Sequence, residues 1–209
     1  MYNVMIFFII TTCVYNDSPL RKQQYTNGIG KLKQVIQDKQ IENYKIILVE
    51  NNGLRPTYLD DFGCDVYYTN NNQLPTQNKG YKELQDVFDC IKQYHIDDHD
   101  FIVKITGRYV LEDNSYFMDV IKNIPTTQFQ CVLRYGPFFA PVNYKMHDCI
   151  SGLIGMRCDH VKRVEYPVQN ECVEWKWAKA TDLIEDDKIH KVDKLGIHIC
   201  PGGNRYFLV

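Results

Sequence analysis

The sequence predicts an α/β domain with a mostly parallel central sheet, on three observations. Apolar runs of strand length alternate with segments of helical periodicity through the first half of the chain. The run at residues 3–13 is rich in Ile and Phe, which is typical of a central strand covered on both faces. The length of 209 residues suits one domain with a sizeable core. We therefore expect a single domain over 1–209, in which residues 111–209 complete a site that residues 1–110 begin.

The elements follow in order from these patterns. In the first half, strands are expected at 3–13, 44–49, 64–68 and 101–105, and helices at 26–40 and from 80 to 91. The second half is less regular, with helices expected at 116–121 and 170–183 and strands at 129–134, 150–156 and 196–200. Strands that alternate with helices imply right-handed crossovers between parallel strands.

The charge balance and the cysteines exclude two classes of protein. The formal net charge is −2 and the two signs are mixed along the chain, whereas nucleic-acid binders usually carry a basic excess. The eight cysteines are scattered, without a C-x-x-C pair. Free thiols in a reducing compartment explain them better than a zinc site. The sequence thus predicts no nucleic-acid partner and no zinc centre.

The apolar N-terminal run, Met5 to Thr11, is interpreted as a buried strand and not as a targeting signal. It lacks the basic flank and the small-residue cleavage site of a signal peptide, and it is too short to span a bilayer. No other segment reaches transmembrane length. We expect a soluble, cytoplasmic protein without a membrane span.

The strand expected at 101–105 and the residues after it are the most informative segment. It carries Lys104 among apolar residues, and an unpaired buried ammonium is costly, so Lys104 needs a partner or a polar cavity. The strand breaks at Thr106-Gly107 and delivers Arg108 and Tyr109 at its carboxyl end, where open α/β sheets bind ligands. A guanidinium matches a phosphate, although an arginine at a strand end also reaches water without any ligand.

The first two expected strands also end in polar residues. Thr11 and Thr12 can hydrogen-bond a base or a ribose, or serve only as β-branched strand residues. Glu50 and Asn51 can hold ribose hydroxyls or a base edge, or form a turn for local reasons. Both pairs are candidate ligand-binding residues.

The segment Asn78-Lys79-Gly80-Tyr81-Lys82 lies where a loop becomes a helix. Asn78 suits the N-cap, and the free N–H groups of a helix start attract phosphate, to which Lys79 and Lys82 add charge. The P-loop pattern is absent here, and no Gly-x-Gly-x-x-Gly run follows the first strand. A P-loop or a dinucleotide-binding domain is therefore disfavoured.

The last motif is the acidic and aromatic run at 170–177. Glu171 and Glu174 lie three residues apart, on one face of the expected helix. Trp175 and Trp177 cannot both face the core, so at least one indole is expected to be partly exposed and suited to stacking on a sugar. A helix packed by one tryptophan, with solvated glutamates, is the alternative.

In this order, the strand-end threonines, the Glu50-Asn51-Asn52 turn, the Asn78-Lys79-Gly80 helix start and the polar end of strand 101–105 resemble the GT-A-type glycosyltransferases. The overall likeness is to small viral or bacterial enzymes that act on surface glycans, and it covers nearly the whole chain. It implies a donor-binding half at 1–110 and an acceptor-binding half at 111–209. The implied reaction moves a sugar from a UDP- or GDP-linked donor to a glycan or glycoprotein hydroxyl, in the host cytoplasm if the chain is viral.

The resemblance also implies roles for single residues. Arg108 would stabilise the leaving diphosphate, and Glu174, or failing that Glu171, would deprotonate the acceptor or, in a retaining reaction, stabilise an oxocarbenium-like centre. Trp175 and Trp177 would bind the acceptor, and the strand at 150–157 would form the floor of the sugar pocket. The donor would contact Thr11, Thr12, Glu50, Asn51, Asn78, Lys79, Lys82, Lys104, Thr106, Gly107 and Tyr109.

One departure from the GT-A pattern concerns the metal. The family usually has an Asp-x-Asp motif where this chain has Thr106 to Tyr109. In one interpretation Arg108, with Lys104 or Lys79, replaces the metal. In the other, Glu112 or Asp113 with His198 holds Mn²⁺ or Mg²⁺. We favour the interpretation in which Arg108 replaces the metal, and we expect that a divalent ion assists it.

Two other functions stay open. A nucleotidyltransferase that forms nucleotide sugars has the same sheet order, but it usually has a Gly-rich loop after the first strand, and residues 15–21 are not Gly-rich. A glycan- or protein-binding module without catalysis is the third hypothesis, because a fold does not imply a function.

Overall fold

The computed structural model describes residues 4–15, 18–142, 147–200 and 205–209. Its centre is a seven-stranded sheet in the order β3-β2-β1-β4-β7-β6-β8. A second, three-stranded sheet has the order β10-β9-β5. The strands are β1 (Ile6–Thr12), β2 (Tyr44–Glu50), β3 (Asp65–Tyr68), β4 (Phe101–Thr106), β5 (Val110–Leu111), β6 (Cys131–Leu133), β7 (Leu153–Arg157), β8 (Ile189–Lys191), β9 (Ile197–Ile199) and β10 (Phe207–Leu208).

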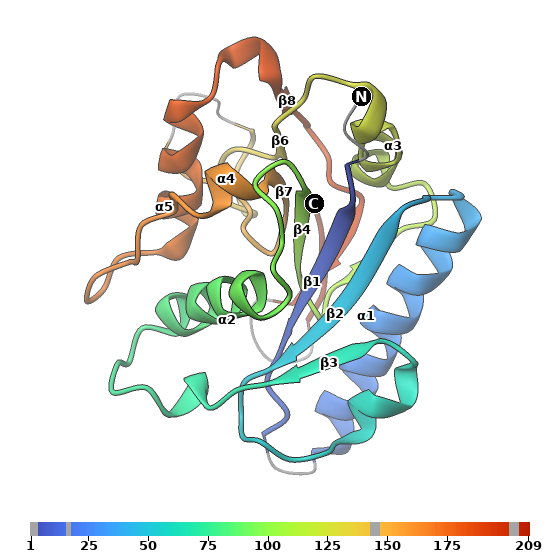
Figure 1. Cartoon of the computed structure of the whole chain (residues 1–209), viewed down its shortest axis with the longest axis vertical. Helices are drawn as coiled ribbons and strands as arrows, with labels where there is room; N and C mark the ends of the chain where they lie inside the picture. The colour runs from blue at the N-terminus through green and yellow to red at the C-terminus, as the bar shows by residue number, and fades with distance from the viewer. Residues whose placement is uncertain (1–3, 16–17, 143–146, 201–204) are drawn as a thin grey trace.

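The large sheet is parallel except at one strand. β1 pairs in parallel with both β2 and β4, β2 with β3, and β6 with β8, whereas β7 runs antiparallel to its neighbours β4 and β6. The carboxyl ends of β1, β2 and β4 therefore meet at one edge, toward the lower end of Figure 1. The predicted fold class, an α/β domain with a mostly parallel sheet, is confirmed.

Helices cover both faces of this sheet (Figure 1). β1 explains how, because its alternate side chains point to opposite faces. Ile6, Phe8 and Ile10 belong to the core that packs against α1 and α3, and Phe7 and Ile9 belong to the core under α2, α4 and α5. The helices are α1 (Pro19–Asp38), α2 (Lys79–Gln93), α3 (Tyr116–Asn123), α4 (Cys158–Val161) and α5 (Val173–Ala180).

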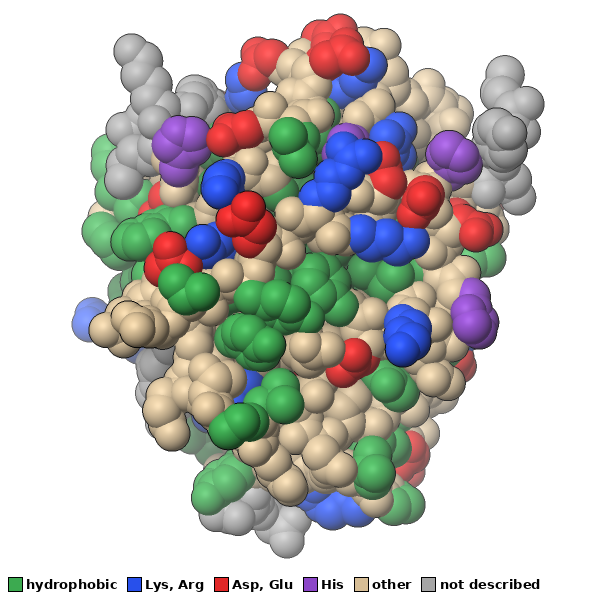
Figure 2. Space-filling model, turned by 60° about the vertical axis from the view of Figure 1, so that its left-hand side comes forward, with side chains coloured by type: hydrophobic (Ala, Val, Ile, Leu, Met, Phe, Trp, Pro, Cys, Tyr) green, Lys and Arg blue, Asp and Glu red, His purple; other side chains and the backbone are tan. Residues whose placement is uncertain are grey.

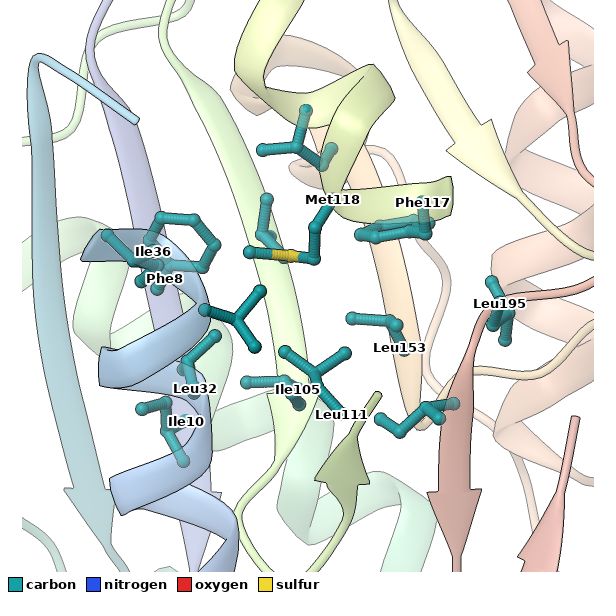
Figure 3. Packing of buried hydrophobic residues seen from close by; sticks show 14 of the residues in the cluster. Phe8, Ile10, Leu32, Ile36, Ile105, Leu111, Phe117, Met118, Leu153 and Leu195 are labelled. Atoms are coloured by element: carbon teal, nitrogen blue, oxygen red, sulfur yellow. The ribbon is translucent and has the colours of Figure 1, made fainter. Parts of the chain in front are cut away.

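The core under α1 and α3 joins the two sheets. Figure 3 shows Leu32 and Ile36 of α1, Ile105 of β4 and Met118 of α3 packed together, with Leu111 and Leu195 beyond them. All of these side chains are buried. The small sheet thus rests on the same core as the large one, which holds the 110–112 segment close to the end of β4.

The structure differs from the sequence predictions mainly at helix starts and at short elements. α1 begins at Pro19 and not near Thr26, because Ser18 caps the helix by accepting the backbone N–H of Arg21 and Pro19 suits the first helical position. In the second half, β5, α4, β8 and β10 were not expected. They are two to four residues long, too short to carry a periodic pattern.

Charges of both signs are interspersed on the face that carries α2 and α5 (Figure 2). No helix in the described part of the chain combines the length and the apolar character that crossing a membrane requires.

Candidate active site

A cleft of about 740 Å³ opens at the carboxyl ends of β1 and β4 and is bounded by the first turns of α2 and α5. Both halves of the chain contribute to it, so the expectation that residues 111–209 help to form the site is consistent with its lining. Eleven of the residues predicted to form the site line the cleft: Thr11, Thr12, Asn51, Asn78, Lys79, Lys82, Thr106, Arg108, Tyr109, Glu171 and Glu174.

An ion pair between a buried lysine and a partly exposed glutamate lies at the base of the cleft. Lys104, 1% exposed, contacts Glu83 of α2 with 2.7 Å between Nζ and Oε1. The same carboxylate oxygen accepts hydrogen bonds from Thr11 Oγ1 at 2.7 Å and Thr106 Oγ1 at 3.3 Å. Burial would raise the pKa of Glu83, but Lys104 and these hydroxyls outweigh it and hold the pKa below its usual value. Glu83 is therefore ionised at neutral pH and ties α2 to the ends of β1 and β4.

Lys104 also connects the base of the cleft to α5. Its Nζ donates to the backbone oxygen of Ser151 at 2.8 Å, and the Ser151 hydroxyl donates to Glu174 Oε1 at 3.0 Å. Glu174 lies in the first turn of α5 and lines the cleft. Among the described residues it has no cationic partner, so its carboxylate is oriented by Ser151 without being neutralised.

Three cations in the cleft are available to a ligand. Arg21, Lys79 and Arg108 all line it, and none of their side chains forms an ion pair or hydrogen bond with the residues that the structure describes. Lys82 also lines the cleft, but its Nζ donates to the backbone oxygen of Asn72 at 2.6 Å. The cleft thus holds an excess of unneutralised positive charge on the side of α1, α2 and β4.

The start of α2 contributes to the cleft through two residues. Asn78 Oδ1 accepts the backbone N–H of Tyr81, which confirms the predicted N-cap, and Asn78 Nδ2 donates to the backbone oxygens of Gln169 and Glu171. At Gly80, a Cβ would lie 2.6 Å from Val173 Cβ. Only glycine lets the two helix starts approach this closely, so Asn78 and Gly80 together place α2 against α5.

Glu171 is engaged by the protein, in contrast to Glu174. Its Oε2 contacts Lys176 Nζ at 2.8 Å and accepts the backbone N–H of Val168 at 2.9 Å. The hydrogen bond from Lys176 is the main reason why the pKa of Glu171 is lowered. A lowered pKa makes a carboxylate a weaker base, so the geometry favours Glu174 for base chemistry.

Glu50 does not face the cleft, contrary to the prediction. It is fully buried, and Val14 N and Asn52 N donate to Oε1, at 2.9 and 3.1 Å. Oε2 accepts from Thr12 Oγ1 and Val14 N, at 2.8 and 2.9 Å. Because both oxygens are satisfied within the protein, Glu50 shapes the loop after β1 and offers nothing to a ligand.

Lys104, Gly107 and Trp177 were also expected at the ligand, and the structure corrects all three. Lys104 is enclosed by Glu83 and Ser151, as described above. Gly107 is buried, and a Cβ there would lie 3.0 Å from side-chain carbons of Ile10 and Thr12. Trp177 is 2% exposed in the core under α5, whereas Trp175 is 49% exposed. The expectation that one indole would be partly exposed is thus confirmed, for Trp175.

Of the residues proposed to hold a metal, Glu112 and His198 lie together, but away from the cleft. Asp113 pairs with Lys31 of α1, and Glu112 lies 3.5 Å from His198 Nε2. None of the three lines the cleft, and the described residues contain no group of three or more His, Cys, Asp or Glu side chains that could hold a metal ion. At the end of β4, the cleft is lined by a hydroxyl, a guanidinium and a phenol from Thr106, Arg108 and Tyr109. This donor set does not suit Mn²⁺ or Mg²⁺, which prefer carboxylates.

Sequence reasoning missed Glu83, Asp86, Arg21 and Ser151. Arg21 and Ser151 carry no motif that singles them out. Asp86 leaves no signal either, because it is two residues from Leu84 and falls outside the apolar stripe of Leu84, Val87 and Ile91. Only the packing of α2 on the strand ends buries it.

No protein-family model matches the chain, and a search of curated proteins found no significant match. Solved structures do match. PcManGT, a mannosyltransferase from Pyrobaculum calidifontis in complex with GDP-Man and Mn²⁺, superposes with a TM-score of 0.56 at 10% identity over 92% of this chain and 57% of that one. The chain therefore spans little more than half the length of that protein.

Two further structures are similar. Glucosyl-3-phosphoglycerate synthase of M. tuberculosis has a TM-score of 0.57 at 13% identity, over 97% of this chain and 73% of that one. A CMP:2-keto-3-deoxy-manno-octonic acid synthetase in complex with CTP has a TM-score of 0.51 at 9% identity, over 90% of this chain and 89% of that one. These likenesses show that the chain has a GT-A-like nucleotide-diphospho-sugar transferase fold.

Proposed function

We propose that the protein is a glycosyltransferase that moves a sugar from a nucleotide-diphosphate donor to a hydroxyl acceptor. One observation carries the proposal: a single cleft holds three cations and a carboxylate, and no described residue forms an ion pair with any of the four. Unneutralised cations suit a diphosphate. A carboxylate kept free of cations suits proton removal from an acceptor hydroxyl.

The diphosphate would lie between Arg108, Lys79 and Arg21. The planar guanidinium of Arg108 can bind two phosphate oxygens at once, and Lys79 adds charge at the start of α2, where N–H groups that lack a helical partner already attract anions. Preorganised cations stabilise the charge that develops on a departing diphosphate. This arrangement supports the version in which Arg108 does the work of a metal, and no step of the proposal requires a divalent ion.

Glu174 would act at the acceptor. The Ser151 hydroxyl fixes one carboxylate oxygen, and the neighbouring Trp175 exposes an indole on which an acceptor sugar could stack. In this proposal residues 1–110 hold most of the donor, and α5 presents the acceptor to it. An inverted product would identify Glu174 as the base, and a retained configuration would identify it as the carboxylate that stabilises the oxocarbenium-like centre.

Two of the similar structures, a mannosyltransferase with bound GDP-Man and a glucosyl-3-phosphoglycerate synthase, support a hexose donor for this chain. The synthetase complexed with CTP supports the alternative, a nucleotidyltransferase. That alternative predicts pyrophosphate release from a nucleoside triphosphate, which sugar transfer does not produce.

The test is transfer from a panel of UDP- and GDP-sugars to glycan acceptors by the wild type and by Glu174→Gln. We expect the variant to lose about 100-fold or more in rate, because general base catalysis contributes that much. Donor affinity, measured by calorimetry, should change by less than about twofold, since the carboxylate acts only on the reacting hydroxyl.

Glu171→Gln is the matched control, with the same chemical change on a carboxylate that Lys176 already engages. It should lose less rate than Glu174→Gln. Unchanged turnover in Glu174→Gln would refute the assignment of Glu174. Pyrophosphate release from triphosphates without sugar transfer would replace the proposal by the nucleotidyltransferase.

A further inference from the structure

Asp86 is a buried carboxylate that the proposed chemistry does not use. It lies on α2, is fully buried and does not line the cleft. Its two oxygens accept three side-chain hydrogen bonds, from Asn51 Nδ2 at 2.7 Å, Asn71 Nδ2 at 2.8 Å and Thr69 Oγ1 at 3.1 Å. Asn51 directly follows β2, and Thr69 directly follows β3. One carboxylate therefore ties two neighbouring strand ends to the helix.

The segments that Asp86 holds form one wall of the cleft. Asn51 and Asn72 line it, and they are joined because the Asn72 backbone N–H donates to the Asn51 oxygen at 2.9 Å. Asn72 Nδ2 donates to Asn52 Oδ1 at 2.9 Å, and Lys82 Nζ donates to the Asn72 oxygen. The position of this asparagine wall (Asn51 and Asn72) thus depends on the contacts beneath it.

We propose that Asp86 is a positioning residue that holds the asparagine wall in the geometry that binds the uncharged, nucleoside end of the donor. The amide of Asn72, which lines the cleft, can pair with ribose hydroxyls and base N–H groups, whereas the diphosphate would lie at Arg21, Lys79 and Arg108. This inference rests on the proposed donor site and goes beyond it, because Asp86 touches no ligand.

The side chain of Asn51 shows how strongly the wall depends on Asp86. Asn51 Oδ1 is buried and makes no hydrogen bond with any residue that the structure describes. The bond from Nδ2 to Asp86 is therefore the contact that sets the orientation of this amide. Protonation of Asp86 would replace an acceptor by a donor facing one of these N–H or O–H groups, and the wall would loosen.

The surroundings place that protonation in an accessible pH range. Burial raises the pKa of Asp86 to about 7, against the three hydrogen bonds, and the negative charge of Glu83 adds to the rise. The other titratable groups around it are Asp89 and Cys90 of α2, Tyr67 of β3 and Cys13 after β1. None of these is a cation, so nothing among them counteracts the effect of burial.

The test is the affinity for UDP and GDP, measured by calorimetry from about pH 5.5 to pH 8.5, a range centred near the pKa of Asp86. The proteins are the wild type, Asp86→Asn, and Asp119→Asn, the matched control at an exposed position of α3. Wild-type affinity should weaken as the pH falls through about 7. At high pH, Asp86→Asn should bind the nucleotide about tenfold more weakly than the wild type, since it loses charge-assisted hydrogen bonds. Its affinity should also not weaken as the pH falls through about 7, because the titrating carboxyl is absent. Any step from the phosphates themselves appears in all three proteins.

The variant is expected to fold. A carboxyl with a raised pKa makes the native state bind more protons than the unfolded state, so its contribution to stability is lost as the pH rises from about 4 to about 7. Removing the charge by Asp86→Asn relieves this cost. Turnover at saturating donor should stay within about twofold of wild type, because only binding depends on the wall.

The outcomes separate this inference from the proposed function. If the wild type binds a nucleotide and Asp86→Asn binds it equally well with the same pH dependence, the positioning role is wrong and the proposed donor site stands. A loss of turnover as large as the loss of affinity would also overturn it. If the wild type binds neither nucleotide, the proposed function and this inference fail together.

Discussion

Two sets of charges occupy the same end of the sheet and behave differently. The engaged charges, Lys104, Glu83, Glu50 and Asp86, are satisfied by other groups of the protein. The open charges, Arg21, Lys79, Arg108 and Glu174, line the cleft, and no described residue of opposite charge pairs with them.

Lys104 and Arg108 are only four residues apart and both come from the β4 segment, so charge and strand-end position did not distinguish them. What distinguishes them is whether another element supplies a partner. Removing the engaged cation Lys104 should therefore affect stability, whereas changing an open charge should affect ligand binding directly.

The largest effect is expected for Lys104→Met. The substitution leaves Glu83, whose side chain lines the cleft and is 26% exposed, without its cation, and breaking this largely buried pair on one side should lower the free energy of unfolding by about 3 kcal/mol. Urea denaturation measures it. Lys31→Met is the control, because its partner Asp113 is exposed, and it should change stability by less than about 0.5 kcal/mol. Equal losses in the two variants would remove the distinction between the two sets of charges.

An intermediate effect is expected for Arg108→Met, on binding and not on stability. Methionine keeps part of the apolar stem and removes the guanidinium, so affinity for the matching nucleotide diphosphate should fall about ten- to a hundredfold, as expected for lost hydrogen bonds to a charged group. The melting temperature without ligand should not change. Arg163→Met, on an exposed arginine away from the cleft, should leave affinity unchanged. Unchanged affinity in Arg108→Met would mean that the open charges do not hold the diphosphate.

The smallest effect is expected for Gly80→Ala, which tests how the open charges are brought face to face. The added methyl overlaps Val173, and overpacking minus the gain in helix propensity should cost about 1 kcal/mol. Gly30→Ala is the control within α1, where a Cβ meets nothing within 4 Å, and it should stabilise the protein slightly. The loss should disappear when Gly80→Ala is made in a Val173→Gly background, because the closest atom, Val173 Cβ, is then absent. If it does not, the close approach of α2 and α5 is not what the glycine provides.

Local sequence determined the first four strands of the large sheet and most of the positions that line the cleft. Alternating apolar runs located β1 to β4, and Asn78 marked the start of α2, because these signals depend on residues close together in the chain. The need of Lys104 for a partner was also evident from the sequence, since a buried ammonium cannot remain unpaired.

Only the tertiary structure decided which partner each polar group has. It joined Lys104 to Glu83, enclosed Glu50 in the loop after β1, paired Asp113 with Lys31 and buried Trp177 while it left Trp175 exposed. It also left Arg108 and Glu174 open to the same cleft. Each of these contacts joins residues from different elements, and the packing of helices on the sheet sets their distances, which no local pattern encodes.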